Sequence, residues 1–271
     1  MPKRRQQQRR ANGGRMVKAP AQAQVPQLFA VDAMFCGPGN LGSQDMNEGC
    51  FCGDAGFFVL KKSDIYPALP HCEWFCSSLA QGTGVPQIPF SVVKHTDGNF
   101  WFGSLWMNGR TPDWWNLAQQ GSIDFLSLAD DLSRIYALDL FVHNDDRHMN
   151  NYMVVPVGTG HRVYSFDYSR AWLYHDALPG AIMMDPGLNT VANKVWMKQT
   201  FGQYLNPAVA LEVLDRIDGI DEVGVRAILA GHPKDWLAQQ QEDDIVDWWT
   251  NGARAARVAA IRDGVNDGTL L

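Results

Sequence analysis

The sequence predicts an α+β fold of two lobes, a β-rich one followed by an α-rich one. Three observations lead to this prediction. Short apolar runs divided by glycine turns fill the first hundred residues, helical periodicity dominates after residue 121, and the change falls at Asn108-Gly109, where we expect a hinge. At 271 residues the chain is long enough for two compact lobes. We therefore expect an N-terminal lobe over 27–108 and a C-terminal lobe over 109–271.

The N-terminal lobe is predicted to be a small antiparallel sheet with one helix packed against it. Apolar runs of strand character are bounded by turns such as Gly53-Asp54-Ala55-Gly56 and Thr96-Asp97-Gly98. The helix is predicted to end where Gly82 and Gly84 follow it. In chain order, the predicted strands cover 28–35, 49–52, 57–60, 88–94 and 99–107, with the helix over 71–81 between the third and the fourth.

The C-terminal lobe is predicted to be mostly helical with one β-hairpin. Apolar residues at helical spacing predict a long buried helix over 122–141, and a polar loop over 143–151 follows it directly. A hairpin is then expected from 152–157 and 163–166 around Gly158-Thr159-Gly160. The chain is predicted to be helical again from about residue 206 and to end with one long helix over 243–262.

Charge is distributed unevenly. The chain has a net charge of −6, yet residues 1–31 carry seven basic and no acidic residues, so the rest of the chain carries −13. We interpret 1–26 as a basic disordered tail. The acidic body argues against a nucleic-acid platform, and any such contact is expected only through the tail or a partner. Because no apolar run reaches the length of a membrane span and no secretory signal is visible, we expect no membrane association and a cytoplasmic location.

All five cysteines fall within residues 36–76, namely Cys36, Cys50, Cys52, Cys72 and Cys76. An odd count without a signal peptide suggests a reducing compartment. A zinc site is one interpretation, with His71 beside Cys72. The spacing lacks the paired C-x2-C of structural zinc ribbons, however, so we expect small buried thiols instead.

The strongest chemical signal is the loop His-Asn-Asp-Asp-Arg-His-Met-Asn-Asn at 143–151. Phosphoryl transfer needs a carboxylate to orient the attacking hydroxyl and an amide oxygen nearby to hold a metal ion, and Asp146 and Asn151 have the five-residue spacing of such a pair. Asp145 and Asn150 have the same spacing, but only the Asp146 frame places His148 two residues later. Asp167, at the end of the predicted hairpin, offers a second carboxylate for Mg²⁺.

The N-terminal lobe offers groups that complement this loop. Its G-x-G-x-x-G run, made of Gly37, Gly39 and Gly42, follows a strand and leads into another, so its backbone amides are suited to lie over phosphates. Lys61 ends the third predicted strand, and Glu73 on the next helix is placed to pair with it. Lys62 competes for the role of Lys61, and strand alternation allows only one of the two to face the cleft.

The loop at 146–151 resembles the D-x-H-x-x-N catalytic loop of HipA-like kinases, and also the D-R-H-x-x-N loop of phosphoinositide kinases. The stretches 136–151 and 166–172, and the run from Glu73-Trp74 to Gly84-Val85-Pro86, are similar to HipA-like proteins as well. The resemblance implies a protein-kinase-like fold that transfers the ATP γ-phosphoryl group to a Ser or Thr hydroxyl. It further implies that Asp146 is the catalytic base, that Asn151 and Asp167 hold Mg²⁺, and that Lys61, steadied by Glu73, contacts phosphates.

The same resemblance suggests partners. HipA-like kinases are often toxins neutralised by a helix-turn-helix antitoxin, and some modify aminoacyl-tRNA synthetases. Some also autophosphorylate a serine of the phosphate loop, for which Ser43 is the candidate here, although a plain turn serine is an equal interpretation. The chain departs from other kinases because Tyr168 and Ser169 follow Asp167 in place of D-F-G, and no A-P-E element is visible. The alternatives are a small-molecule or lipid kinase of the same fold and a nucleotide-binding pseudokinase.

Overall fold

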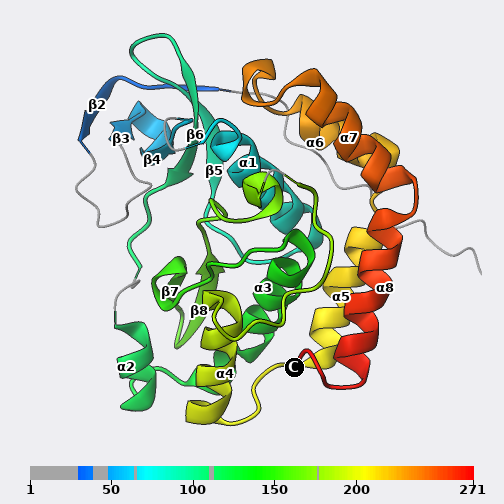
Figure 1. Cartoon of the computed structure of the whole chain (residues 1–271). Helices are drawn as coiled ribbons and strands as arrows, with labels where there is room; N and C mark the ends of the chain where they lie inside the picture. Colours follow the sequence, from blue (N-terminus) through cyan, green and yellow to red (C-terminus); the bar gives the residue numbers. More distant parts are fainter. Residues whose placement is uncertain (1–29, 39–47, 64–65, 110–112, 176) are drawn as a thin grey trace, which may run out of the picture.

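A computed structural model describes residues 30–38, 48–63, 66–109, 113–175 and 177–271. The predicted tail over 1–26, together with Gly39, Gly42 and Ser43, lies outside these residues. The described chain is a mixed α/β structure, with a curled sheet beside a group of helices (Figure 1).

The N-terminal sheet has six strands in the order β1-β5-β6-β4-β3-β2. All neighbours in it are antiparallel except β1 and β5, which run parallel. The prediction of an antiparallel sheet is therefore correct except at this edge. The strands are β1 (Val31–Asp32), β2 (Phe35–Pro38), β3 (Glu48–Phe51), β4 (Phe57–Lys61), β5 (Phe90–Lys94) and β6 (Phe100–Leu105).

The single strand predicted over 28–35 is wrong, because two short strands at opposite edges of the sheet share this region. The chain changes partner between them: the Ala33 amide donates to the Lys94 carbonyl beyond β1, and the Met34 amide donates to the Phe51 carbonyl of β3. Since β1 and β2 are adjacent in sequence but lie at the two edges, their connection draws the edges together. The sheet therefore curls and encloses a small core of its own, made of Cys50, Cys52, Phe58, Leu60 and Val93.

Helix α1 (Leu69–Thr83) extends the predicted 71–81 helix by two residues at each end. Gly84 ends it in the left-handed conformation, and the Gly84 amide bonds back to the carbonyls of the last turn. The helix is buried along almost its whole length because it packs against β4 and β6 on one side and the C-terminal helices on the other. The Trp74 indole nitrogen, for example, donates to the Ile228 carbonyl at 3.0 Å.

The remaining elements are a short helix, a hairpin and a series of longer helices (Figure 1). They are α2 (Trp114–Gln119), α3 (Ala129–Val142), β7 (Tyr152–Val157), β8 (Gly160–Ser165), α4 (Asn189–Phe201), α5 (Pro207–Asp218), α6 (Glu222–Ala230), α7 (Gln239–Thr250) and α8 (Ala253–Asn266). Single 3₁₀ turns cover Gly53–Ala55, Phe125–Leu128, Met149–Asn151, Trp172–His175 and Lys234–Trp236.

Two helix predictions need correction. The buried helix predicted over 122–141 begins only at Ala129, because the Asp124 carboxylate accepts from the Leu126 amide and starts a 3₁₀ turn in front of it. The long terminal helix predicted over 243–262 is in fact α7 and α8. Gly252 separates them with a φ of 99°, a backbone conformation that glycine adopts without strain and that interrupts an α-helix.

One main hydrophobic core continues across the predicted boundary at 108–109. It includes Val92 and Phe102 of the sheet together with Leu138 of α3 and Val213 of α5. A second link joins β8 to the segment after α1, where the Ser165 backbone and hydroxyl both bond to the Pro86 carbonyl at 2.9 Å. No helix among the described residues is long and apolar enough to cross a membrane.

The expectation of buried thiols is correct for only part of the cysteine set. Cys52, Cys72 and Cys76 are free and buried, but Cys36 and Cys50 form a disulfide. The two lie directly opposite each other on β2 and β3, with their Cα atoms 4.2 Å apart, which brings their side chains into bonding range. Sequence spacing alone could not show this pairing, because it depends on the register of the hairpin.

Candidate active site

Three predicted residues come together in a buried charged cluster. The Lys61 ammonium, at the end of β4, lies 3.1 Å from Asp167 Oδ1 and 3.7 Å from Glu73 Oε1 on α1. The side chains of Lys61 and Glu73 are only 6% and 1% exposed, so this is not a solvated surface pair. Lys62 points elsewhere, 2.6 Å from Glu48 Oε2, as strand alternation requires.

The two carboxylates of this cluster are shifted in opposite directions. Burial raises the pKa of Glu73 to about 8, against the lowering effect of Lys61, while the Asp167 charge raises it further. Burial would also raise the pKa of Asp167, but the Lys61 ammonium and hydrogen bonds from Ser169 outweigh it and leave the pKa well below its usual range. Asp167 is therefore the ionised partner of Lys61.

Local backbone geometry holds both carboxylates in place. Asp167 has a φ of 63°, in the left-handed region, two residues beyond the end of β8. The Ser169 hydroxyl donates to Asp167 Oδ1 at 2.6 Å, and the Tyr168 amide donates to Glu73 Oε2 at 3.0 Å. The segment after β8 is thus fixed to α1 as well as to β4.

Asp146 is the predicted base, and its carboxylate is held from two sides. Asn189, the first residue of α4, donates to Oδ1 at 2.5 Å, and the Arg170 guanidinium lies 3.3 Å from Oδ2. Asn151 braces the loop from within, because its Nδ2 donates to the Asp146 backbone carbonyl at 3.0 Å. That hydrogen bond uses the nitrogen of the carboxamide, so its oxygen is the atom suited to a cation.

Asp145, the competing residue, faces a different neighbour. Its Oδ2 lies 2.9 Å from His175 Nε2, in the 3₁₀ turn Trp172–His175. The carboxylates of the two adjacent aspartates therefore have separate partners, Asp146 with Asn189 and Arg170, and Asp145 with His175.

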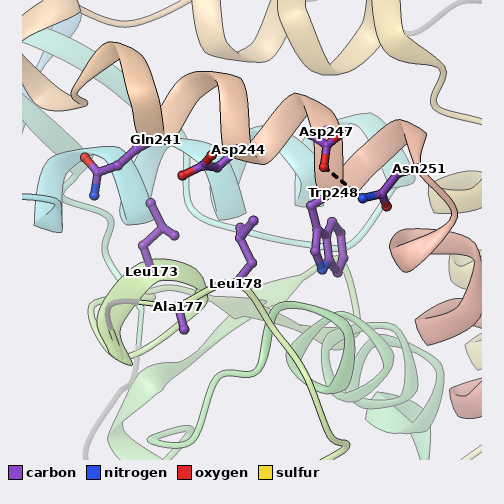
Figure 2. A pocket seen from close by; sticks show the side chains of 8 residues that line it. All are labelled: Leu173, Ala177, Leu178, Gln241, Asp244, Asp247, Trp248 and Asn251. Atoms are coloured by element: carbon purple, nitrogen blue, oxygen red, sulfur yellow. Dashed lines mark hydrogen bonds between the residues drawn. The ribbon is translucent and has the colours of Figure 1, made fainter.

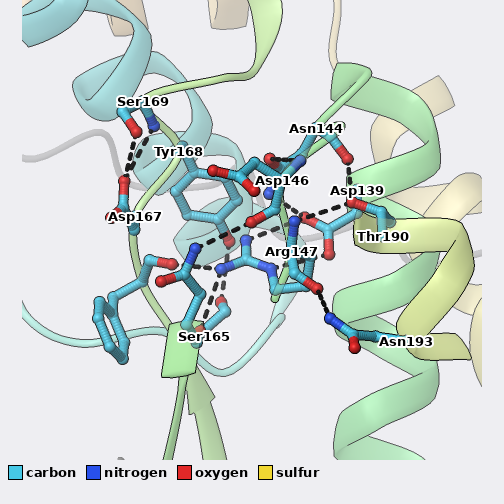
Figure 3. Close-up of polar contacts among 12 residues, drawn as sticks. Asp139, Asn144, Asp146, Arg147, Ser165, Asp167, Tyr168, Ser169, Thr190 and Asn193 are labelled. Carbon is cyan, nitrogen blue, oxygen red and sulfur yellow. Dashed lines mark hydrogen bonds and ion pairs between the residues drawn. The ribbon is translucent and has the colours of Figure 1, made fainter. Parts of the chain in front are cut away.

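A buried arginine joins the loop to the segment that carries Asp167 (Figure 3). Arg147 donates to the backbone carbonyls of Asn151 and Phe166, the residue before Asp167. Its guanidinium is fully buried, paired with Asp139 of α3, and lies 4.7 Å from the centre of the Tyr168 ring. Burial would lower the pKa of Arg147, but Asp139 and the tyrosine rings raise it above its usual value, so the charge is kept.

Helix α4 supports the same loop through residues near its N-terminus. The Thr190 hydroxyl accepts from the Arg147 amide at 2.9 Å and donates to the Asn144 carbonyl, and Asn193 donates to the Arg147 carbonyl at 2.8 Å. Asn144 in turn donates to Asp139 at 2.9 Å. Loop residues 144–147 are therefore fixed by α3 on one side and α4 on the other (Figure 3).

Local sequence patterns did not predict the roles of Asp139, Arg147, Arg170, Asn189 and Thr190. One signal was available for the first pair: Asp139 is an acidic residue within a predicted buried helix, and such a residue needs a charged partner. The contacts of Asn189 and Thr190 carry no local signal, because more than 40 residues separate them from the loop. Of the three glycines in the predicted phosphate loop, only Gly37 is described, on β2 opposite Gly49.

A separate pocket of about 360 Å³ lies between α7 and the segment after the Trp172–His175 turn (Figure 2). Its lining combines apolar Leu173, Leu178 and Trp248 with acidic Asp244 and Asp247. None of the predicted site residues lines it. Pockets often mark binding sites, but here the buried charges and perturbed pKa values are found in the Lys61–Asp167 cluster, so we place the candidate active site there.

The fold is similar to that of one known kinase. No protein-family model matches the chain, and no curated protein matches it in sequence. The crystal structure of the Helicobacter pylori proinflammatory kinase CtkA matches with a TM-score of 0.56 at 13% identity, over 89% of this chain and 99% of CtkA. A HipA of Shewanella oneidensis, in a complex with HipB and operator DNA, matches with a TM-score of 0.48 at 15% identity, over 76% of this chain and 60% of HipA.

The match to CtkA agrees with the protein-kinase-like fold predicted from the sequence. The likeness covers almost the whole of CtkA and extends well beyond the region around 136–172 where the sequence resemblance was most specific.

Proposed function

We propose that this chain is an ATP-dependent phosphotransferase that moves the γ-phosphoryl group of ATP to a serine or threonine hydroxyl of a protein. The observation that carries the proposal is the buried contact of 3.1 Å between Lys61 and Asp167. It brings the two residue types that bind phosphates and a divalent ion to one point between the sheet and the segment after β8. The kinase-like fold supports the same conclusion.

In this proposal each residue has a distinct task. Asp146, oriented by Asn189 and Arg170, accepts the proton of the attacking hydroxyl. Lys61 contacts the phosphates, and Glu73 keeps its ammonium in place. The glycines Gly37, Gly39 and Gly42 are proposed to cover the phosphates with backbone amides.

The residues present fit a magnesium ion. Asp167 stays ionised because its pKa is lowered, and Asn151 offers an amide oxygen, so the donor set is the oxygen set that Mg²⁺ prefers. When bound, the ion would supply positive charge that neutralises the phosphate oxygens. Asp167 and Asn151 would hold it. The fixed segment around Asp167 limits the reorganisation that binding requires.

The adjacent lysines offer a matched test. We expect the purified protein with Mg²⁺ and γ-labelled ATP to transfer label to a protein acceptor. Lys61→Met should reduce transfer by roughly 100-fold or more, the scale of losing a charged group that stabilises the transition state. Lys62→Met should keep most of the transfer, because Lys62 pairs with Glu48 and not with Asp167. Equal losses in the two variants would contradict the assignment of Lys61.

The destination of the label tests the substrate class. After incubation with a cell lysate, label in a protein band supports the proposal, whereas label in an extractable metabolite or lipid would make the chain a small-molecule or lipid kinase. Binding of ATP, seen as a thermal shift, without transfer to any acceptor would make it a nucleotide-binding pseudokinase.

A toxin role, a helix-turn-helix antitoxin, an aminoacyl-tRNA synthetase as target, autophosphorylation of Ser43 and a cytoplasmic location remain predictions from the sequence. A gene for a small helix-turn-helix protein beside this one would support the toxin role. Mass spectrometry of the purified protein would show whether Ser43 carries phosphate.

A further inference from the structure

Four potential metal ligands meet at the base of the β2–β3 hairpin, outside the candidate active site. They are the sulfur atoms of Cys36 and Cys50, a carboxylate oxygen of Glu48 and a ring nitrogen of His95, and all four atoms lie within 4.8 Å of one another. Cys36 lies opposite Cys50, and Glu48 is two residues before Cys50, so the three share one face of the hairpin. His95 directly follows β5 and reaches them because the sheet curls.

The spacing of these atoms is close to that of a tetrahedral metal site. Zinc binds thiolate sulfur at about 2.3 Å and imidazole nitrogen or carboxylate oxygen at about 2.0–2.2 Å, which places neighbouring ligands of a tetrahedron roughly 3.3–3.8 Å apart. The four atoms need only small movements to reach such distances once the two sulfur atoms are no longer bonded to each other. Two thiolates, an imidazole and a carboxylate form a donor set suited to zinc.

The surroundings of His95 are typical of a metal ligand. Its Nδ1 lies 2.9 Å from Asp97 Oδ1 and 3.2 Å from the Asp97 backbone nitrogen, contacts that fix the ring from its far side. Asp97 is itself held by the Asn99 amide at 2.8 Å. The Nε2 atom is buried and 3.2 Å from Glu48 Oε2, without the geometry of a hydrogen bond. This nitrogen is therefore directed into the cluster.

Glu48 already attracts positive charge. The Lys62 ammonium lies 2.6 Å from its Oε2 atom. A metal ion would compete with this ammonium, which is attached to a flexible side chain and is able to move aside.

We propose that the Cys36–Cys50 pair switches between a disulfide and a zinc site completed by Glu48 and His95. A dithiol or two monothiols reduce the S–S bond: two electrons and two protons pass to the cysteine sulfurs, and the reductant becomes a disulfide. Zinc binding then releases both thiol protons as two zinc–sulfur bonds form. The disulfide form lacks the two thiolates and does not bind zinc.

The switch lies next to the candidate active site in the sheet. Lys61 and Lys62 are consecutive on or just beyond β4; Lys61 contacts Asp167, whereas Lys62 contacts Glu48. Two neighbouring lysines therefore point to different sites: Lys61 to the candidate active site and Lys62 to the proposed metal site. The zinc inference does not depend on the proposed phosphotransferase function, because it rests on a different set of residues.

Cobalt titration of the full chain tests the proposal without any activity assay. The protein is reduced with dithiothreitol, freed of reductant by anaerobic gel filtration, and titrated with Co²⁺. We expect one equivalent to bind, with the thiolate-to-cobalt charge-transfer band and the intense visible bands of a tetrahedral site, and Zn²⁺ to bleach both. The oxidised protein should show neither band. Absence of these bands from the reduced protein would overturn the proposal.

Variants identify the ligands. His95→Gln should weaken metal binding at least tenfold, and the double variant Cys36→Ser/Cys50→Ser should abolish the charge-transfer band. Cys52→Ser is the matched control, because Cys52 is a buried free cysteine close to the pair but outside the set of four. It should leave the spectrum and the affinity unchanged. A charge-transfer band that survives in the double variant, or disappears in Cys52→Ser, would assign the metal to other thiols and refute the site.

Discussion

Arg147 and Asp139 form a fully buried ion pair with two parallel contacts, Nε to Oδ2 and Nη2 to Oδ1, each 2.9 Å long. The Nη1 atom of the guanidinium donates to the Asn151 and Phe166 carbonyls. One side chain therefore connects helix α3, the loop that carries Asp146 and the segment that carries Asp167. The relative placement of the two candidate catalytic carboxylates depends on this connection.

Replacement of Arg147 by Lys is expected to destabilise the protein by about 3–5 kcal/mol, because an ammonium cannot make the forked contact and leaves Asp139 poorly paired in the interior. Denaturant unfolding measures the loss. Arg226→Lys is the control: Arg226 contacts Glu222 at 2.8 Å with both side chains half-exposed, and such a pair contributes about 1 kcal/mol or less. Similar small losses in both variants would show that Arg147 does not anchor the loop.

The charged cluster at Glu73 predicts a pH dependence of stability. The pKa of Glu73 is raised to about 8 in the folded chain, from 4.5 when unperturbed, so the folded state holds this proton more tightly. The contribution of Glu73 to the free energy of unfolding is therefore complete below pH 4.5 and is lost as the pH rises through about 8. Glu73→Gln, which resembles the protonated form, should remove this loss.

Urea unfolding of both proteins between about pH 5 and 8 tests the sign. The stability of the wild type relative to Glu73→Gln should fall as the pH rises. The comparison cancels the effects of titratable groups that both proteins share. One of these is His71: burial lowers its pKa, so its contribution to folding stability is lost at low pH rather than at high pH. A constant difference between the two proteins over this range would show that Glu73 is ionised throughout.

The charged cluster of Lys61, Glu73 and Asp167 could be predicted from the sequence, because it depends on the order of the elements and on the alternation of side chains along a strand. Lys61 ends a strand, Glu73 is on the helix that follows, and Asp167 comes two residues after a hairpin, so only the order of the elements was needed to predict that they approach each other. Lys62 lies away from Asp167 for the same local reason. The pairing of Asp146 with Asn151 could also be predicted locally, because the two residues are only five apart in one short loop.

Features created by distant contacts could not be predicted. The short strands β1 and β2 separate at Ala33 and Met34 because these residues bond to different strands far along the chain. The Cys36–Cys50 disulfide depends on hairpin register, and the support of Asp146 by Asn189 depends on where α4 docks. In each case the determining partner is remote in sequence, so local propensity gave no sign of it.

The adjacent aspartates predict different effects on catalysis. Asp146→Asn should lower phosphoryl transfer by roughly 100- to 10,000-fold, the range for loss of a general base, with little change in folding. Asp145→Asn should lower it less, because the Asp145 carboxylate contacts His175, whereas the Asp146 carboxylate contacts Asn189 and Arg170. Transfer of ³²P from labelled ATP measures both. If Asp145→Asn has the larger effect, the base is the other aspartate.

Arg257 of α8 lies outside the candidate site, and we expect it to support the loop at 143–151 through the end of α3. It donates to the Leu140 and Phe141 carbonyls in the last turn of α3 at 2.6 and 2.7 Å, and to the Gly180 carbonyl at 2.6 Å. Burial lowers the pKa of Arg257 to about 10, so it is still charged at neutral pH. Carbonyls at a helix end lack partners within the helix, and Arg257 supplies them just before the loop at 143–151 begins.

Arg257→Met keeps much of the apolar stem but removes these hydrogen bonds, and each buried group left without a partner costs about 1–3 kcal/mol. We expect a loss of stability of at least about 2 kcal/mol in denaturant unfolding. Arg262→Met is the control on the same helix, because Arg262 contacts Asp215 at 2.8 Å with both side chains partly exposed. We also expect faster hydrogen exchange over 143–151 in Arg257→Met alone, since the frayed end of α3 leads directly into this loop. Unchanged exchange there would mean that α4 and Arg147 hold the loop without help from α8.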